Sequence, residues 1–564
     1  MKFPFLGGAY TGRSTYANAQ TCRNLMLEGD ASTPDGNALV GTPGYSVYAA
    51  TGTYAAEIRG MITFPDPRNT DGDKIFAVIG NRLYVYVSAG WVRKDNVAGS
   101  TWSMATTTGR VSMAYMGLGT SVGIVQDYAI AIADGDKFNY YSVVGVTQTA
   151  ALIATPAKVS NVVFLDGRFI ANDLSNVGRF YYSGILTPGT YDAFNFATAE
   201  GSPDALSTIF ADRRELYLLG DETTEVWYNA GDLNNPFQRY QGGFIQTGCA
   251  ARHSVARLDN TIVWLARDER GKVFVAILGP NYQPASLSTP QINYLFSNYA
   301  TTSDAFAITY RQAGHELYVL TFPTQNITWV YDAVTKEWHQ WGSSTSGRHL
   351  ANCMVAFQGK TIMATTGADG VIYELSPTVY KDNSAAIYRE RTSHHVMAEK
   401  QRVPIAELRI DIQVGTSTTI SRNSTLSASF GAGDASITTA ATTSVAANET
   451  VVVQLDNGGW HLSTVAASAV ATLVMTDPLT SPAASGNLVA CYADDRFTME
   501  WSKNGAETFS TPTVLHVGTA TNRDTWRAVV RKLGVAREWT LRFKTSAAIK
   551  IVIKGVFARL WGEA

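Results

Sequence analysis

The chain has 564 residues, of which 45% are hydrophobic, 11% aromatic and only 16% charged, with a formal net charge of −2. A core of this size needs neither disulfides nor metals. The four cysteines lie far apart without a C-x-x-C pair, which argues against a disulfide scaffold, a zinc site or a redox motif. The low charge, against roughly 25% in an average domain, and the 48 glycines indicate an all-β protein that buries much of its surface against partners.

The N-terminus, MKFPFLGGAY, carries an apolar stretch that is shorter than a signal-peptide core and is interrupted by Pro4. We therefore expect no export signal. No run approaches the roughly 18 consecutive apolar residues of a transmembrane helix, so we expect no membrane-spanning segment. Together with the sparse cysteines, these features favour folding inside a cell.

A unit recurs seven times between about residues 70 and 380, at spacings of roughly 40–55 residues. Each copy has a polar turn, an apolar strand, a second turn and an aromatic-rich strand. Blades of this kind cannot cover their own apolar faces alone, so they must stack and close into a ring. We therefore predict a β-propeller of about seven blades, with six or eight as alternatives. The copies are residues 72–86, 126–142, 165–183, 212–229, 258–277, 315–332 and 358–375.

The remainder divides by composition. Residues 408–414 alternate as a strand with one buried face, and four further strands are predicted between 497 and 553. Between them, Ser, Thr and Ala dominate residues 416–490, which hold one basic residue and four acids. The predicted domains are an N-terminal arm and closing segment (1–58), the propeller (59–380), a C-terminal β platform or barrel-like domain (388–415 with 491–562) and a β insertion (416–490). In the platform, we expect Trp501, Trp526 and Trp539 to pack on one side of a single sheet.

The turn SKNGAETF, residues 502–509, resembles the aspartate box of sialidase propellers. It occurs once, outside the propeller repeats, with Asn where Asp is usual, and Ser and Asn side chains hydrogen-bond to the local backbone of turns. We therefore predict a structural role for Ser502, Asn504, Gly505, Thr508 and Phe509.

Positive charge concentrates between Arg523 and Arg559, where ten Lys and Arg face two acids. This segment is either a solvated strand face or a surface for an acidic partner. Binding of nucleic-acid phosphates is a third, weaker interpretation. The candidate residues are Arg523, Arg527, Arg531, Lys532, Arg537, Arg542 and Lys544.

Other motifs do not combine into a catalytic or cofactor site. Ser121 lies in a G-x-S-x-G pattern, but a strand rather than a helix follows it. His394 and His395 lack further zinc ligands. No P-loop, Rossmann fingerprint or H-E-x-x-H motif occurs. We expect no catalytic residue, cofactor or metal.

Elements at both ends resemble one family. They are YTGRS with NAQ, NL and Glu28 near the N-terminus, and RER (389–391), WSKNG with TFS (501–510) and RKLGVAR (531–537) near the C-terminus. These are similar to elements of the packaged-DNA stabilization proteins, the tail hub or nozzle proteins of short-tailed bacteriophages. Asn504 and Ala506 depart from that pattern, in which Asp and Gly are usual, and residues 416–490 are an addition to it.

The resemblance implies a virion tail protein that assembles in the host cytoplasm as a hexameric ring below the portal and its adaptor. Viral DNA would pass through the ring without sequence-specific binding, and a needle or plug would close it, with tail fibres or spikes as further partners. Two alternatives remain: a sialidase-like phage glycan depolymerase, suggested by propeller plus box, and a carbohydrate-binding propeller, suggested by aromatic side chains that we expect to be exposed, such as Trp338 and Trp341.

Overall fold

The structure is a computed structural model. It describes residues 2–560 except 15–17, 30–35, 50–53, 55, 66–72, 88–89, 98–99, 102, 120–126, 145–146, 233–234, 344–345, 398–401, 415–421, 441–449, 470, 493–496 and 516–526. Contacts divide the chain into two compact units, each described by itself below. The terminal unit comprises Met1–Gly8, Ser14–Thr42 and Ala385–Ala564, and the propeller unit comprises Ala9–Arg13 and Pro43–Ser384.

Nearly all regular structure is β, as predicted. Apart from the helix α1 (Pro290–Ser297) and the short 3-10 helix η1 (Pro280–Tyr282), the named elements of the described ranges are strands. None of the helices found there is long and apolar enough to cross a membrane.

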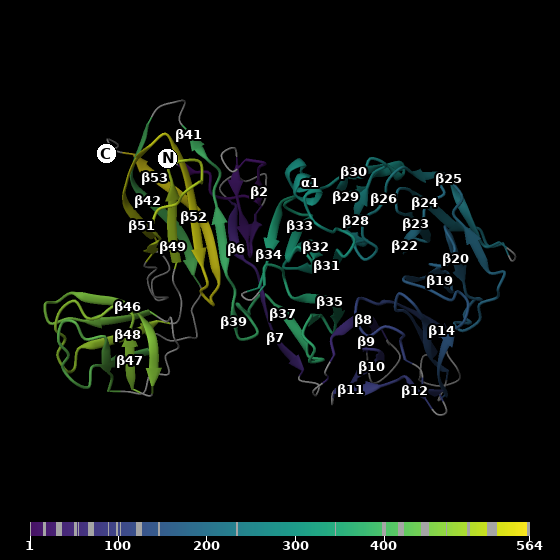
Figure 1. The fold of residues 1–564 in the computed structure, drawn as a ribbon, viewed down its shortest axis with the longest axis horizontal. Coiled ribbons are helices and arrows are strands. Elements are labelled where there is room, and N and C mark those ends of the chain that lie inside the picture. The colour runs from purple at the N-terminus through teal and green to yellow at the C-terminus, as the bar shows by residue number, and fades with distance from the viewer. Residues whose placement is uncertain are drawn as a thin grey trace. The chain divides into compact units, whose positions relative to one another are not determined.

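Seven antiparallel sheets follow one another through the described part of the propeller unit and form its blades (Figure 1). Blades 1 to 3 are β8 (Ile58–Phe64), β9 (Lys74–Ile79), β10 (Arg82–Val87) and β11 (Gly90–Arg93); β14 (Ser112–Gly119), β15 (Asp127–Ala133), β16 (Phe138–Val144) and β17 (Thr147–Ile153); and β18 (Val162–Leu165), β19 (Arg168–Asn172), β20 (Arg179–Tyr182) and β21 (Phe196–Thr198). The blade number of seven is therefore confirmed, and six and eight are wrong.

Blades 4 and 5 are β22 (Leu206–Asp212), β23 (Glu215–Gly220), β24 (Thr224–Asn229) and β25 (Phe237–Ile245); and β26 (Gly248–Cys249), β27 (Ala256–Leu258), β28 (Thr261–Arg267), β29 (Val273–Leu278) and β30 (Pro284–Ser286). Blades 6 and 7 are β31 (Phe306–Gln312), β32 (His315–Phe322), β33 (Ile327–Asp332) and β34 (Trp338–Trp341); and β35 (Ala351–Phe357), β36 (Lys360–Thr365), β37 (Ile372–Ser376) and β7 (Gly44–Ala49). The unit also holds β2 (Tyr10–Thr11), β12 (Asn96–Val97), β13 (Ser100–Thr101) and β38 (Lys381–Asp382).

The sequence repeats correspond to the two middle strands of each blade. The repeat at 126–142, for example, covers β15 and most of β16, and all seven residues of β15 are buried. Middle strands are covered by a neighbouring blade on both faces, so they read as nearly continuous apolar runs. First and last strands are partly solvated, and their weaker pattern makes them hard to recognise in the sequence.

The ring is closed by a strand from the N-terminal region. β7 pairs antiparallel with β37, with Tyr45 opposite Leu375 and Gly44 opposite Ser376. A shared apolar core then joins the last blade to the first, because Ile75 of β9 packs in the same cluster as Ile362 of β36. The closing role predicted for part of residues 1–58 therefore lies in Gly44–Ala49.

Outside the insertion, the described part of the terminal unit contains two sheets. One has the order β5 (Leu25–Glu28), β6 (Ala38–Gly41), β53 (Ile551–Leu560), β42 (Val403–Val414) and β51 (Arg527–Ala536), with β1 (Lys2–Phe3) added beside β53. In the other, β40 (Arg389–Thr392) lies between β4 (Cys22–Arg23) and β52 (Glu538–Thr545), followed by β49 (Phe497–Ser502) and β50 (Thr513–Leu515). β41 (Val396–Met397) also pairs with β52. The remaining short strands of this unit are β3 (Ala19–Gln20) and β39 (Ala385–Ala386).

The prediction of one C-terminal sheet was therefore wrong, because the chain changes sheets between β51 and β52. Alternating polarity marks a strand but does not say which strand pairs with it. Trp539 is fully buried and donates from Nε1 to the carbonyl of Val403 (3.0 Å), which links the two sheets. The register places the half-buried Trp501 opposite Leu541, on the same face as Trp539. Trp526 lies outside the described residues.

Two buried arginines of β40 hold the N-terminal segment against the C-terminal strands. Arg391 donates from Nε to the carbonyl of Phe5 (2.7 Å), from Nη1 to that of Gly8 (2.6 Å) and from Nη2 to Gln20 Oε1 (2.8 Å). Arg389 donates to the carbonyls of Thr42 (3.2 Å) and Ala547 (3.1 Å). Both side chains are fully buried, and bonds from a charged donor are stronger than neutral ones.

Replacing Arg391 by Ala should destabilise the terminal unit by about 3–5 kcal/mol, because several buried carbonyls would lose a charged donor. Urea unfolding monitored by tryptophan fluorescence measures the change. Arg409→Ala, at a half-exposed arginine of β42, is the matched control and should cost little. A loss below about 1 kcal/mol for Arg391→Ala would contradict the clamp.

The insertion is a small closed barrel with its own core. Its strands are β43 (Arg422–Thr425), β44 (Ser436–Thr438), β45 (Thr450–Gln454), β46 (Trp460–Ala469), β47 (Thr472–Met475) and β48 (Leu488–Tyr492), in the order β43-β48-β45-β46-β47-β44. Beyond β43 and β44 the two sheet edges meet, as Ser427 N donates to Thr438 O (3.0 Å) and Ala440 N to Thr425 O (2.8 Å). Closure removes open strand edges, and the buried side chains, among them Val451 and Leu473, form a separate cluster.

Deleting residues 416–490 and joining the ends with a short Gly linker should leave the propeller folded. Arg422 pairs with Cys491 in the register of β43 and β48, so the ends of the insertion lie side by side. Replacing a closed domain by a short loop changes the loop-closure entropy only slowly, by about 0.6 kcal/mol per doubling. Circular dichroism and limited proteolysis of the deletion variant give the measurement. Loss of the propeller's protease resistance would show that the insertion is part of the core.

Candidate functional site

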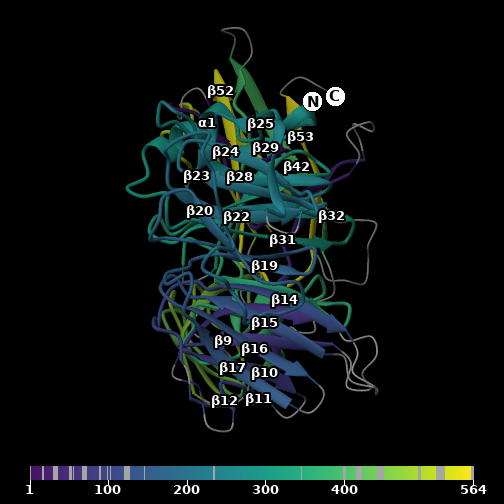
Figure 2. The same ribbon diagram turned by 90° about the vertical axis from the view of Figure 1, so that its right-hand side faces the viewer.

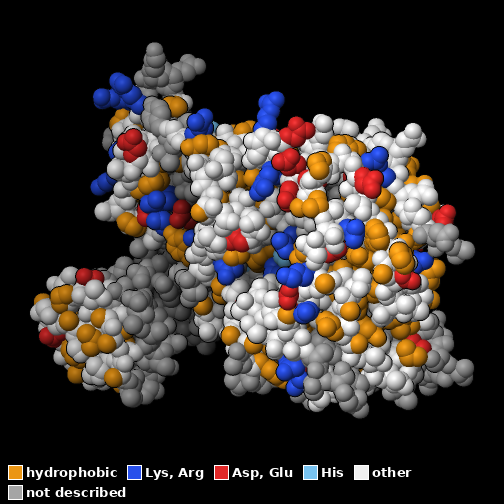
Figure 3. Space-filling model, turned by 45° about the vertical axis from the view of Figure 1, so that its right-hand side comes forward, with side chains coloured by type: hydrophobic (Ala, Val, Ile, Leu, Met, Phe, Trp, Pro, Cys, Tyr) orange, Lys and Arg blue, Asp and Glu red, His pale blue; other side chains and the backbone are white. Residues whose placement is uncertain are grey.

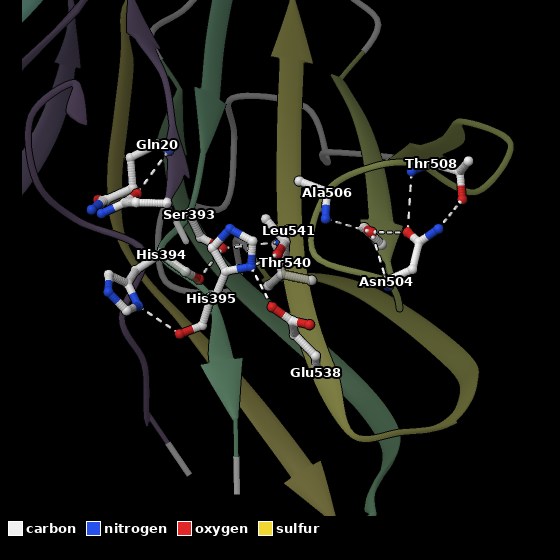
Figure 4. A network of polar contacts seen from close by, with 12 residues as sticks. Gln20, Ser393, His394, His395, Asn504, Ala506, Thr508, Glu538, Thr540 and Leu541 are labelled. Carbon is white, nitrogen blue, oxygen red and sulfur yellow. Dashed lines mark hydrogen bonds and ion pairs between the residues drawn. The ribbon is translucent and has the colours of Figure 1, made fainter. Parts of the chain in front are cut away.

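The turn that resembles an aspartate box is built from side-chain hydrogen bonds (Figure 4). Ser502 Oγ accepts from Ala506 N (3.0 Å) and donates to Asn504 Oδ1 (2.8 Å). Asn504 Oδ1 also accepts from Thr508 N (3.1 Å), while Asn504 Nδ2 donates to Thr508 Oγ1 (2.9 Å). Gly505 and Ala506 adopt left-handed φ angles of 68° and 65°. The Asn therefore fulfils the acceptor role of the usual Asp, and the side chains that define the box are engaged within the turn.

Phe509 and Arg542 connect this turn to the sheet. The Arg542 guanidinium lies 3.7 Å from the centroid of the Phe509 ring. Arg542 also forms an ion pair with Glu500, and Lys544 Nζ lies 3.1 Å from the same carboxylate. Glu500 is buried, with 5% of its side chain exposed. Two of the basic candidates thus neutralise a buried acid on the face of β52 opposite Phe543.

Ser502→Ala should destabilise the terminal unit by about 1–3 kcal/mol, since a buried hydroxyl that serves three partners is removed. Asn504→Asp should be nearly neutral, because the carboxylate keeps the acceptor Oδ1 and its second oxygen can accept from the Thr508 hydroxyl, which reverses the direction of that hydrogen bond. Thermal unfolding of both variants checks this. Equal stability of Ser502→Ala and the wild type would show that the turn is held by other contacts.

The remaining basic candidates belong to β51 and its end. β51 is the edge strand of its sheet in the order given above. Arg531 lies on the outer face, with 73% of its side chain exposed, and its Nε is 3.1 Å from Glu407 Oε2. Lys532 has a left-handed φ of 62° at an irregularity of the strand, and Arg537 lies at the exposed turn into β52. Arg523 and the side chain of Arg527 lie outside the described residues.

The structure adds basic residues that sequence reasoning missed. The register places Arg409 of β42 between Val529 and Phe557, and Glu407 between Arg531 and Arg559. Lys2 of β1 lies opposite Phe557. Directly opposite residues share a face of a sheet, so one exposed face carries Lys2, Arg409, Arg531 and Arg559 around Val529 and Phe557. We call this set the basic face. Arg409 sits in a clear strand pattern, but only the pairing reveals its neighbours.

The basic face carries more positive than negative charge. Its acids are Glu407, which pairs with both Arg409 (3.5 Å) and Arg531 (3.1 Å), and Asp411. Exposed ion pairs of this kind contribute at most about 1 kcal/mol each to stability. Long-range attraction of an acidic surface is the stronger consequence of such a charge distribution.

The buried histidine of the predicted pair is tied to an acid. His395 Nδ1 lies 2.7 Å from Glu538 Oε1 and 3.2 Å from Thr540 Oγ1, and both residues of the ion pair are buried (Figure 4). His394 Nδ1 lies beside the carbonyl of His395 (2.5 Å). Within the described ranges, no group of three or more His, Cys, Asp and Glu could hold a metal ion. Ser121 lies outside those ranges.

Trp338 and Trp341 do not form a sugar-binding platform. Each is only 2% exposed, and Trp338 Nε1 donates to the carbonyl of Leu287 (3.2 Å). The expectation of exposed rings was wrong because β34 buries both within the propeller unit. The carbohydrate-binding alternative loses the residues that motivated it.

A family model described as "Bacteriophage P22 Gp10, beta-propeller" matches residues 1–380. The chain belongs to this family. The match includes all seven blades and the N-terminal strands, and it agrees with the resemblance seen in the sequence. A member of the Gp10 family is a bacteriophage structural protein, which places this chain in the virion.

The similar solved structures carry no functional argument. The extracellular domain of a putative hybrid two-component system from B. thetaiotaomicron is 9% identical over 75% of this chain and 51% of that one, with a TM-score of 0.37. This chain thus aligns with about half of that protein. The BBS1N structure in complex with ARL6DN is 12% identical over 59% and 98% (TM-score 0.37), and YCF48 from Cyanidioschyzon merolae is 11% identical over 57% and 96% (TM-score 0.33). No curated protein matched the sequence.

Proposed function

We propose that this protein is the tail hub, or nozzle, of a short-tailed bacteriophage. Six copies would form a ring below the portal and its adaptor, retain the packaged DNA and conduct it into the host. The family match over the whole propeller carries this proposal. The architecture supports it, because closed propellers and a closed inserted barrel leave few open strand edges, a property that suits a rigid part of a particle.

The basic face is proposed as a docking surface for an acidic region of another tail protein. Its two exposed apolar side chains, Val529 and Phe557, lie within a ring of arginines and a lysine. Apolar centres with polar rims are the usual anatomy of protein interfaces. A DNA-gripping role is less favoured, because each contact between Lys or Arg and phosphate adds affinity that would oppose sliding.

A non-enzymatic role is part of the proposal. The box-like turn is structural, and the His–acid pairs at His395–Glu538 and His315–Asp332 are buried. In the first pair, the second nitrogen of His395 faces no hydroxyl or thiol among the described residues, since Nε2 has no hydrogen-bond partner there. The depolymerase alternative therefore has only the general propeller shape in its favour.

The purified protein, alone or with its adaptor, should form a particle of about six subunits in sedimentation velocity and mass photometry. Phage assembled with the triple variant Arg409→Gln, Arg531→Gln, Arg559→Gln should lose tail attachment or leak DNA. Arg311→Gln, at an exposed arginine of β31, is the matched control and should leave infectivity unchanged.

Two results would overturn the proposal. One is a monomer that remains monomeric with the adaptor and cleaves host polysaccharide. The other is normal virion assembly in the absence of this protein. If the triple variant instead assembles normally but ejects DNA more rapidly, the basic face contacts DNA rather than a protein partner.

A further inference from the structure

The propeller has a central channel whose mouth is lined by the residues that precede the innermost strands. β8, β14, β22, β31 and β35 face the middle of the ring in Figure 1. Because each blade repeats the same up-and-down order, these strands start at the same end of the channel. Glu57, Arg110 and Asp304 precede β8, β14 and β31, so side chains distant in sequence meet at one mouth.

Arg110 is held across this mouth in a fixed orientation. From blade 2, its guanidinium lies 4.1 Å from the ring centroid of Phe306 in blade 6. Its Nη1 donates to the backbone carbonyl and to Oδ1 of Asn352 in blade 7, the latter at 3.0 Å. Asn352 is itself fixed, since its Nδ2 donates to the carbonyl of Ile58 (2.7 Å). A stacked and hydrogen-bonded guanidinium has little rotational freedom left to lose on binding.

One edge of Arg110 is left for a ligand. Its Nε and Nη2 have no hydrogen-bond partner among the described residues, whereas Nη1 has two. Nε and Nη2 form the parallel N–H pair that recognises two oxygens of a carboxylate in bidentate fashion. The remaining donors thus form a ready fork.

The surroundings of Arg110 combine a neutral imidazole with side chains of both charges. Burial, together with the positive charges of Arg110 and Arg252, lowers the pKa of His253 to about 3. This imidazole is therefore neutral near pH 7 and can donate an N–H. Burial lowers the pKa of Arg110 and of Arg348, and the negative charge of Glu57 partly offsets this effect in both. Asp304 also raises the pKa of Arg348. Figure 3 shows Lys and Arg side chains interspersed with Asp and Glu side chains on one face of the propeller.

We propose that the mouth of the propeller channel binds a monoanionic carboxylate, held bidentately by Nε and Nη2 of Arg110 over the Phe306 ring. His253 would donate a further hydrogen bond, and Asn352 acts as a positioning residue through Arg110. The carboxylate comes either from a sugar acid or from a free peptide C-terminus, which share this chemistry.

The test uses saturation-transfer NMR on the full-length protein at pH 7. The probes are glucuronate and acetyl-Gly-Gly, and the neutral controls are glucose and acetyl-Gly-Gly-amide. At least one acid should bind saturably, and its neutral counterpart should bind at least tenfold more weakly. The acid that binds more tightly shows whether the carboxylate comes from a sugar acid or from a peptide C-terminus. Arg110→Gln should weaken binding by about ten- to a hundredfold, the usual effect of losing a charge-assisted pair. Arg110→Lys keeps the charge but loses the fork and should weaken binding as well.

Arg311→Gln is the matched control, because Arg311 is exposed on β31 and should leave binding unchanged. If Arg110→Gln does not fold, the test rests on the binding measured for Arg110→Lys and on the wild-type protein. In the wild type, the ring resonance of His253, assigned by its loss in His253→Gln, should shift when the acid is added. The inference is overturned if acids and neutral controls bind alike, if phosphate binds more tightly than either acid, if the Arg110 variants bind as the wild type does, or if the His253 resonance does not move.

Discussion

The pairing of β7 with β37 is the contact on which the rest of this architecture depends. Without it, the last blade would lack its outer strand and present an open edge. With it, the chain enters the propeller at Gly44 directly opposite Ser376, where the last blade ends. The segments before and after the propeller therefore start from neighbouring points. This explains how strands from the first 42 residues and from the last 180 can share sheets in one unit.

Buried arginines give this β structure much of its internal cross-linking. In the terminal unit, Arg391 and Arg389 connect the N-terminal segment to β40. In the propeller unit, Arg59 connects loops of the chain to one another. Arg59 is fully buried and donates to the carbonyls of Gly80, Thr106 and Thr108. Loops and short strands leave carbonyl groups unpaired, and a buried guanidinium with five donors satisfies several of them at once. Only 16% of the residues are charged, and several of these few charges are buried arginines that hold the backbone together.

Positive charge serves three different purposes in the two units. Arg542 and Lys544 compensate the buried Glu500, the basic face presents arginines to solvent, and Arg110 spans the mouth of the propeller channel. Their proposed consequences differ because burial and partners differ: the first pair compensates the charge of a buried acid, the exposed cluster is proposed to attract an acidic surface, and the fork is proposed to recognise one anion. Within the propeller, Arg110 of blade 2 contacts Phe306 of blade 6 and Asn352 of blade 7.

The sequence by itself determined the all-β class and predicted about seven blades, with six and eight left open, and it predicted a structural role for the box-like turn. These depend on local patterns: buried middle strands read as apolar runs, and the bonds of Ser502, Asn504 and Thr508 stay within a few residues. The tertiary structure decided which strands pair. The sequence could not show that β51 and β52 belong to different sheets, that β7 completes the last blade, or that Trp338 and Trp341 are buried. It also could not bring Arg409 beside Arg531 and Arg559, or Arg110 against Phe306 and Asn352, because such contacts join residues more than a hundred positions apart and arise only from strand register and ring closure.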